Sequence, residues 1–557
     1  MPGGLLNLVS YGNQNVILNG NPSKTFFKCA YAKHTNFGLQ KFRIDFEGLR
    51  TLRMSESSHF TFKVPRYADL LMDTYLVVNL PTIWSPIVPP NCDGTPGAFN
   101  FTWRPYEFKW IKNLGTQMIE RVRFTVGGQV IQEFTGQYLY NLVERDFDNA
   151  KKDLYYKMTG NVAELNDPAN AYGRINVYPS VYPTNSADYS TLGPEPSIRD
   201  RQLYIPLNIW FTLASKMAFP LVSLQYAELH IEIDIRPVKE LFVVRGVEDD
   251  GGYYHQPNLN NVNYQFYRFL QLPPDTTLTE ESYTDKRTDW AADVHLLSTY
   301  AFLTNDEVRV FAKKEQTYLI KQAYHTNFFN VTGSKRVDLE SLGMVTNWMW
   351  FFQRSDVNLR NEWSNYSNWA YDNTLPHNVI DPLNNSATFS CDATNFNPDS
   401  NPDGTDTNIM ITGDYSVSNQ KDIMLSWALL LDGKYRENEL KAGVLDYVEK
   451  YTRTSGNAPD GLYCYNFCMN TSPTNFQPSG AINLSKFNNI QFEITTYTPP
   501  LDPSAQFLTI CGPDGESIGV NKPNWRIYDY NYNLTVLEER YNILTFSSGN
   551  AGLMYAR

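Results

Sequence analysis

The sequence has few cysteines, 6 in 557 residues, and only Cys464 and Cys468 lie close together. Small secreted domains that are held together by disulfides are far richer in this residue. If residues 461–469 form a strand, the Cα atoms of this pair lie about 13 Å apart, which is beyond the reach of a disulfide. We therefore expect core thiols and a reducing, cytosolic site of folding.

Basic residues and long apolar runs are also scarce. No Lys or Arg precedes Lys24, so the basic region of a secretory signal is missing, and no run of 18 apolar residues predicts a membrane span. Lys and Arg number 47 against 59 Asp and Glu, which gives a formal net charge of −12. A chain of this charge would repel a phosphate backbone, so we expect no direct contact with nucleic acid.

The common catalytic motifs are missing as well: the sequence has no phosphate-binding loop, dinucleotide fingerprint, zinc-protease helix or nucleophile elbow. Residues 399–404 fill the first half of a calcium loop, but Met410 stands where the bidentate Glu is needed. His230 shares a strand face with Glu228 and Glu232, and side chains two apart on a strand point in parallel and do not converge on a metal. We predict that the chain is not an enzyme and holds no cofactor or metal.

Strand signals are plentiful. The chain has 37 Tyr and 32 Phe, residues that favour strands. Apolar residues alternate with polar ones over 228–235, and 120–134 reads as a hairpin that turns at Gly127-Gly128. We expect further strands at 60–64, 294–303, 346–352, 423–431, 462–469 and 490–496.

Few and short helices are expected, and the best candidates are 136–145 and 437–451, where apolar residues recur at helical spacing. Long stretches rich in Pro, Asn, Asp, Gly and Ser, at 81–108, 148–200 and 365–420, are expected to be loops. Many strands with few helices predict β-sandwiches, and the length suits two such domains.

Nine segments of the chain, taken in order, resemble the signatures of one family. They are 21–37, 69–81, 115–139 and 204–233 in the first half, and 293–322, 429–440, 461–467, 477–489 and 528–556 in the second. The family is that of the major capsid proteins of nucleocytoplasmic large DNA viruses, in particular those of algal and amoebal giant viruses. The run Gln477-Pro-Ser-Gly-x-x-Asn-x-Ser is the most specific of these signatures.

The resemblance implies an all-β fold of two tandem eight-stranded antiparallel jelly-roll sandwiches, with long inserted loops and a few short helices. The expected parts are an inner-face segment 1–24, a first jelly-roll 25–247, a connector 248–289 and a second jelly-roll 290–557. The implied function is a homotrimeric, pseudo-hexagonal capsomer that tiles the icosahedral shell of the virion and is made in the host cytoplasm. The implied partners are neighbouring capsomers and minor capsid and penton proteins, above an internal membrane that the chain does not span.

Seven Asn-x-Ser/Thr sequons occur, among them Asn330, Asn365 and Asn384, which we name as candidate glycosylation sites. Two other functions stay open at this point. The aromatic cluster around Trp348 and Trp350 is compatible with a carbohydrate-binding or glycoside-cleaving sandwich. A β-rich, acidic spike protein of the same viruses is the other alternative.

Overall fold

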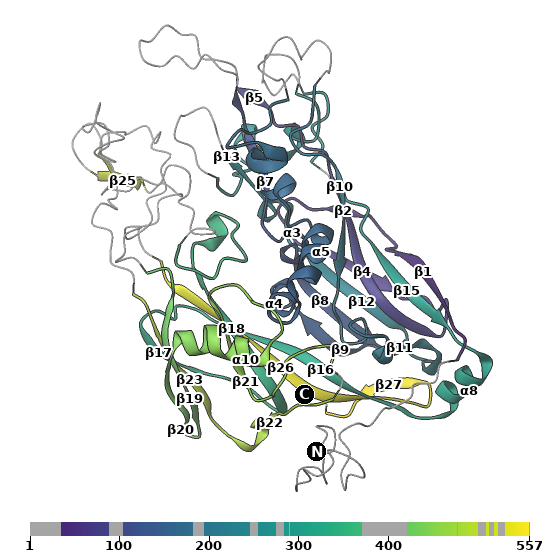
Figure 1. The fold of residues 1–557 in the computed structure, drawn as a ribbon. Coiled ribbons are helices and arrows are strands. Elements are labelled where there is room, and N and C mark those ends of the chain that lie inside the picture. The colour runs from purple at the N-terminus through teal and green to yellow at the C-terminus, as the bar shows by residue number, and fades with distance from the viewer. Residues whose placement is uncertain are drawn as a thin grey trace, which may run out of the picture.

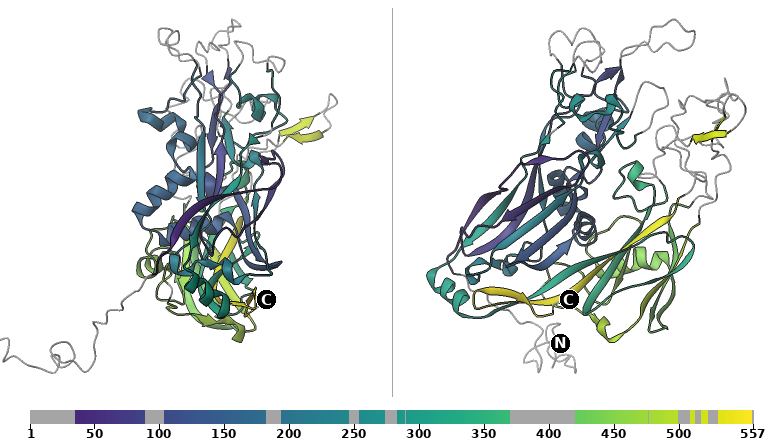
Figure 2. Two further views of the ribbon diagram at one scale, coloured as in Figure 1. Left: turned by 90° about the vertical axis from the view of Figure 1, so that its right-hand side faces the viewer. Right: turned by 180° about the vertical axis from the view of Figure 1, so that it is seen from behind.

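The computed structural model of the protein describes residues 35–88, 104–181, 194–245, 254–273, 283–288, 290–369, 420–475, 477–498, 508–511, 517–521 and 530–555. Their strands form two β-sandwiches that stand side by side and are inclined to one another (Figures 1 and 2). Each sandwich consists of two antiparallel four-stranded sheets at its centre, to which shorter strands are added at the edges.

The first sandwich is built from eight main strands of the described chain. Sheet 1A has the order β1-β15-β4-β10 and sheet 1B the order β3-β12-β8-β9. The bounds are β1 (Gly38–Asp45), β3 (Ser58–Lys63), β4 (Leu70–Leu80), β8 (Ile119–Val126), β9 (Gln129–Phe134), β10 (Arg201–Pro206), β12 (Leu229–Ile235) and β15 (His295–Phe302).

The second sandwich repeats this topology. Sheet 2A has the order β16-β26-β18-β21 and sheet 2B the order β17-β23-β19-β20. In both sandwiches, the first, eighth, third and sixth strands form one sheet and the second, seventh, fourth and fifth form the other, so the jelly-roll prediction is confirmed. The bounds are β16 (Gln316–Phe328), β17 (Ser334–Asp338), β18 (Met344–Arg354), β19 (Met424–Leu431), β20 (Lys434–Lys441), β21 (Leu462–Asn466), β23 (Ile490–Thr496) and β26 (Tyr532–Ser547).

Short elements decorate this frame. The additional strands are β2 (Thr51–Leu52), β5 (Ile87–Val88), β6 (Arg104–Pro105), β7 (Glu107–Trp110), β11 (Phe219–Pro220), β13 (Phe242–Arg245), β14 (Trp290–Ala291), β22 (Ile482–Asn483), β24 (Leu508–Cys511), β25 (Ser517–Asn521) and β27 (Asn550–Leu553). The α-helices of the described residues are α3 (Leu114–Gln117), α4 (Gly136–Asp146), α5 (Asn149–Thr159), α6 (Ala163–Asn166), α8 (Asn305–Lys313) and α10 (Glu449–Arg453). A π-helical turn, η10 (Val444–Val448), precedes α10 directly.

Most local predictions agree with the structure. Strand β12 buries every second residue, and β8 and β9 form the expected hairpin, with Gly127 and Gly128 at φ 58° and 83°. A positive φ at both turn positions is the conformation that glycine adopts at little cost. The helix expected at 136–145 is α4, which Thr135 caps by accepting a hydrogen bond from the Tyr138 backbone N–H.

Two segments differ from the prediction. The expected loop 148–200 begins with α5, because Asp148 caps its first turn and Gly160 ends it at φ 80°. The helix expected at 437–451 begins late: residues 434–441 are strand β20. Asp432 and Gly433, at φ 48° and 75°, turn the chain back so that β20 pairs with β19, and the helix starts only at residue 442.

The connection between the two halves also differs from expectation. We expected the second jelly-roll to begin at residue 290, but β15 pairs with both β1 and β4 in the first sandwich. The jelly-roll needs this eighth strand to fill sheet 1A between its first and third strands. The chain leaves the first sandwich only after β15, through α8.

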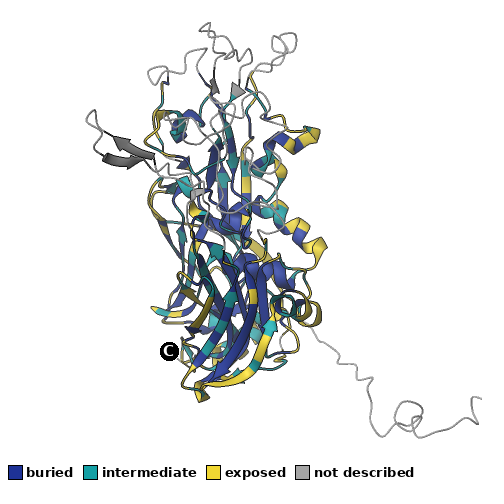
Figure 3. Ribbon diagram, turned by 90° about the vertical axis from the view of Figure 1, so that its left-hand side faces the viewer, coloured by how far each residue is buried: buried dark blue, intermediate teal, exposed yellow. Residues whose placement is uncertain are grey.

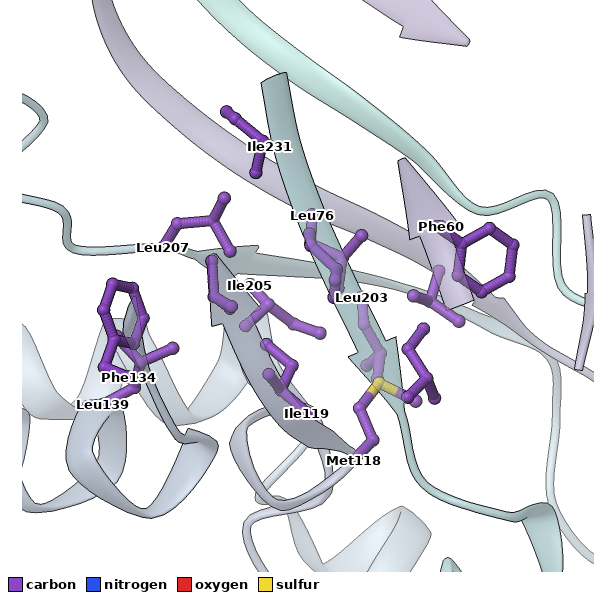
Figure 4. Close-up of a cluster of buried hydrophobic side chains, with 14 of the residues drawn as sticks. Phe60, Leu76, Met118, Ile119, Phe134, Leu139, Leu203, Ile205, Leu207 and Ile231 are labelled. Carbon is purple, nitrogen blue, oxygen red and sulfur yellow. The ribbon is translucent and has the colours of Figure 1, made fainter. Parts of the chain in front are cut away.

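Two apolar cores hold the sandwiches together. Side chains from sheets 1A and 1B, such as Leu76, Leu203 and Ile231, meet between the sheets, and Leu139 of α4 closes the lower end (Figure 4). The second core is packed with aromatic rings, of which Trp348, Trp350 and Trp427 are fully buried. Burial is strongest along the strands that face these cores (Figure 3).

Candidate functional site

Of the residues that suggested a metal or redox site, those within the described ranges do not form one. The side chain of Glu228 pairs with Lys63 at 2.6 Å, and His230 lies 3.8 Å from it on the exposed face of β12. Within the described ranges, no three His, Cys, Asp or Glu side chains are arranged to hold a metal ion. The calcium-like segment 399–404 lies outside the described residues.

The two close cysteines are buried free thiols, as predicted: Cys464 lies in β21 and Cys468 just after it. Burial raises the pKa of the Cys464 thiol to about 12, so it stays protonated at neutral pH. An apolar thiol with this pKa is a packing residue and not a nucleophile.

The three candidate glycosylation sites lie in different environments. Asn330 is exposed. Asn365 is buried, and its amide nitrogen donates to Glu362 at 2.9 Å and to the Trp369 carbonyl at 2.8 Å. Asn384 lies outside the described residues. Glycosylation stays a prediction, and the exposure of Asn330 makes it the candidate that a folded chain presents best.

The aromatic cluster around Trp348 does not form an exposed platform for a sugar ring. Trp348, Trp350 and Phe352 point into the core of the second sandwich, and Phe351 stacks on Tyr366 with ring centroids 4.1 Å apart. The cluster is core packing, so the observation that suggested carbohydrate binding is explained by the fold.

A buried polar network lies where the two sandwiches meet, in a contact region that we call the seam. Its centre is helix α4 of the first sandwich, which packs on the outer face of sheet 2A (Figure 1). Arg145, fully buried, donates to Asp146 at 2.6 Å, to Glu539 of β26 at 3.0 Å and to the Asn347 side-chain oxygen at 2.8 Å. Charged groups from both sandwiches therefore satisfy one another away from water.

The remaining polar atoms of this network are also matched. Glu539 accepts hydrogen bonds from the Tyr138 hydroxyl at 3.0 Å and the Asn347 amide at 2.8 Å. Asp146 accepts one from the Thr471 hydroxyl at 2.5 Å. Because every carboxylate oxygen of Asp146 and Glu539 has a donor, the cost of burying these charges is largely offset.

The charges of the seam stabilise one another in their ionised forms. Burial opposes the charge of Arg145, but Asp146 and Glu539 outweigh it and raise the pKa of Arg145 above its usual range. Burial likewise opposes ionisation of Glu539, but Arg145 holds the pKa of Glu539 below its usual value. Arg145 and Glu539 are therefore both charged at neutral pH.

Apolar and backbone contacts extend the seam around α4. Tyr138 and Leu142 pack in one apolar cluster with residues of sheet 2A, which are Met349, Phe351, Leu462, Cys464 and Leu537. Gly456 donates its backbone N–H to the Arg145 carbonyl at 2.8 Å. A Cβ at Gly456 would lie 2.5 Å from the Glu144 carbonyl oxygen, so only glycine allows this approach.

A second contact region lies farther along the seam. The Asn361 amide donates to the carbonyl oxygens of Lys239 and Phe242, both at 2.9 Å, and the Trp363 indole donates to the Glu240 carbonyl at 3.1 Å. The Arg236 guanidinium stacks 4.3 Å from the centroid of the Trp363 ring. Two separated contact regions fix the relative orientation of the sandwiches.

The sequence alone did not reveal this seam. Its one local signal is the run Glu144-Arg145-Asp146 at the C-terminal end of α4, three charged residues that are all buried. Their partners Asn347 and Glu539 lie 202 and 394 residues away from Arg145 in the sequence, so no local pattern connects them.

No helix among the described residues has both the length and the apolar composition to cross a membrane. Two family profiles match the chain: "Major capsid protein N-terminus" over residues 25–285 and "Large eukaryotic DNA virus major capsid protein" over residues 307–552. The major capsid protein of Phaeocystis pouchetii virus is 25% identical over 100% of both chains.

Solved structures agree in fold. The VP54 structure of PBCV-1, fitted into a reconstruction of the virophage Sputnik, has a TM-score of 0.59 at 19% identity and covers 96% of this chain and 100% of its own. The Faustovirus major capsid protein has a TM-score of 0.60 at 14% identity and covers 94% and 93%. Because the two profiles together span both sandwiches, the chain belongs to the family of large eukaryotic DNA virus major capsid proteins, which are structural proteins of the virion and not enzymes.

Proposed function

We propose that three copies of this chain form a capsomer of pseudo-hexagonal outline that tiles an icosahedral shell. The observation that carries the proposal is the seam: two sandwiches of the same topology are joined at one orientation by buried charges and hydrogen bonds. Three such rigid pairs place six similar sandwiches around one axis. Closed rotational symmetry is the usual outcome for identical subunits.

The domain boundaries are part of this proposal. We propose a first jelly-roll that runs from residue 25 through β15 and a second that begins after α8, since β15 closes sheet 1A. Residues 1–24 are proposed to face the inside of the shell, where minor capsid and penton proteins and an underlying membrane would lie. Assembly in the host cytoplasm is consistent with the buried free thiols Cys464 and Cys468.

Electron microscopy of the purified protein tests the capsomer directly. Class averages viewed along the symmetry axis should show a ring of six density lobes with threefold symmetry. Single pairs of lobes, or a ring of another symmetry, would contradict the proposal.

A stained gel of purified virus particles tests abundance and separates a shell protein from a minor spike protein. The 64.0 kDa band should dominate the gel. A band present at trace level would contradict a role in tiling the shell.

A further inference from the structure

An exposed apolar helix face lies on the second sandwich. The helical segment 442–453, which includes η10 and α10, exposes Tyr447, Val448 and Tyr451 by 59%, 53% and 91%. These positions share one side of the helix, whereas Leu445 on the other side is fully buried in the core. Water contact at three large apolar side chains is unfavourable, and contiguous patches of this kind mark interaction surfaces.

This segment occupies the same place in the second sandwich as α4 does in the first. Each follows the fifth strand of its jelly-roll, and Phe134 and Leu440 are the inward residues near the ends of those strands. Five residues later along each chain segment, Leu139 and Leu445 insert into the core of their own sandwich. By the same count, the seam residues Tyr138, Asn141, Leu142 and Arg145 correspond to Val444, Tyr447, Val448 and Tyr451.

The surfaces on which such a helix packs correspond as well. The third strands, β4 and β18, are each 11 residues long, and both pair with the eighth strand through an irregularity at the same place. In sheet 1A it lies between the pairs Thr74–Ser298 and Leu71–Tyr300. In sheet 2A it lies between Asn347–Glu539 and Val345–Arg540.

This shared register assigns each outward residue of sheet 2A a counterpart in sheet 1A. The residues Met349, Phe351, Leu462, Cys464 and Leu537 correspond to Tyr75, Val77, Tyr204, Pro206 and Leu297. The first set lies in the seam with α4 and is almost fully buried. The second set is also largely apolar. Val77 is buried, but Tyr204 is 36% exposed and Tyr75, Pro206 and Leu297 are only partly covered.

One chain cannot bring these two surfaces together. The segment 442–453 and sheet 1A lie on opposite sides of the molecule (Figure 1, and Figure 2, right). A second copy can present its sheet 1A to this helix in the way that sheet 2A is presented to α4 within the chain. The seam thus supplies the geometry for a contact between chains.

We propose that the segment 442–453 of one copy docks through Tyr447, Val448 and Tyr451 on the outer face of sheet 1A of the next copy. The contact joins different surfaces of the two copies, and its repetition gives a ring when the rotation between copies closes after three. The inference rests on the proposed trimer for the number of copies and adds the residues that join them.

Chemistry at the centre of the contact differs from that of the seam in a way that suits assembly. Tyr451 stands at the position of Arg145, and Asp73 and Thr299 stand at those of Asn347 and Glu539. A phenol that donates to Asp73 replaces a buried ion pair. Before assembly both surfaces face water, and a neutral hydroxyl costs less to transfer out of water than a guanidinium.

Charge introduced on the helix face tests the contact. Because Tyr447 and Tyr451 are exposed, the monomer of the double variant Tyr447→Asp/Tyr451→Asp should fold and should melt at the same temperature as the unmodified monomer. The protein concentration at which half of the trimer dissociates should rise at least about tenfold. The control Tyr172→Asp changes an aromatic residue that is 75% exposed elsewhere and should trimerise like the unmodified chain. Unchanged trimerisation of the double variant would overturn the contact.

Cross-linking identifies the partner surface. The variant Tyr451→Cys/Asp73→Cys, treated with a short bismaleimide, should give bands of two and three chains on a denaturing gel. The pair Tyr451→Cys/Glu232→Cys, with Glu232 on the outer face of sheet 1B, should stay at one chain, as should the unmodified protein. A trimer without the specific cross-link overturns this contact and leaves the proposed capsomer intact, whereas an unmodified chain that never trimerises overturns both.

Discussion

Replacement of Arg145 by methionine isolates the contribution of the seam. Methionine retains much of the side-chain length and removes the charge, so Asp146 and Glu539 lose the guanidinium that lies 2.6 and 3.0 Å from them. Both carboxylates are buried, and neither can regain water without opening the seam. The variant therefore leaves uncompensated negative charge between the two sandwiches.

The expected cost is about 3–5 kcal/mol in the free energy of unfolding, the range for removal of one partner of a buried ion pair. Glu539→Gln alone should also destabilise the protein. The double variant Arg145→Met/Glu539→Gln should lose less than the sum of the two single variants, because the second change removes one of the charges that the first leaves unpaired.

Urea unfolding followed by tryptophan fluorescence measures these differences. The control Arg309→Met breaks an ion pair of 3.9 Å whose side chains are 74% and 96% exposed, and it should change stability by less than about 1 kcal/mol. If Arg145→Met is as mild as this control, or if the effects of the two seam variants simply add, the charged network does not hold the sandwiches together.

Three further predictions follow from burial and charge. Ile233→Asp places a charge in the first core, so it should lower the free energy of unfolding by about 3 kcal/mol or more and abolish soluble protein. Glu232→Lys, on the opposite face of β12, should have a mild effect. Equal expression and melting temperature for the two variants would mean that the faces are assigned wrongly. Burial opposes ionisation of Asp356, but Arg354 lowers the pKa of its carboxyl from 3.8 to about 2. The ionised carboxylate therefore stabilises the fold above pH 3.8, and this stabilisation is lost as the pH falls toward 2. In melting temperatures measured over a pH series, Asp356→Asn should flatten this acid dependence, and an unchanged profile would contradict the pKa shift of Asp356. The raised pKa of Cys464 predicts that a thiol-reactive dye labels it only after denaturation, and rapid labelling of the native protein would show that the thiol is accessible.

The sequence predicts the parts of the fold that depend on local pattern. Strand β12 and the hairpin of β8 and β9 follow from a two-residue period and from the Gly127-Gly128 turn, because burial on one face imposes that period. Helix α4 follows from apolar residues at helical spacing. The sequence predicts a helix over 437–451 because Leu440, Val444 and Val448 recur every four residues. The first part of this range belongs instead to strand β20, whose residues are mostly exposed and charged, so alternation of apolar residues does not mark it.

The seam and the assignment of β15 depend on contacts between distant residues. No local pattern near residue 295 indicates that β15 pairs with β1. The two strands are far apart in sequence: the Arg43 side chain of β1 donates to Asp293, which lies 250 residues later, just before β15. Residues 346–352 likewise show no alternation, because sheet 2A buries one face in its own core and the other against α4. A strand buried on both faces carries no period that reveals its partners.

Light scattering of the purified chain, over a range of concentrations, tests most directly whether this jelly-roll pair assembles as proposed. The proposed trimer should appear as a species of about 192 kDa, three times the 64.0 kDa of one chain. A species that stays at 64.0 kDa at every concentration would contradict it.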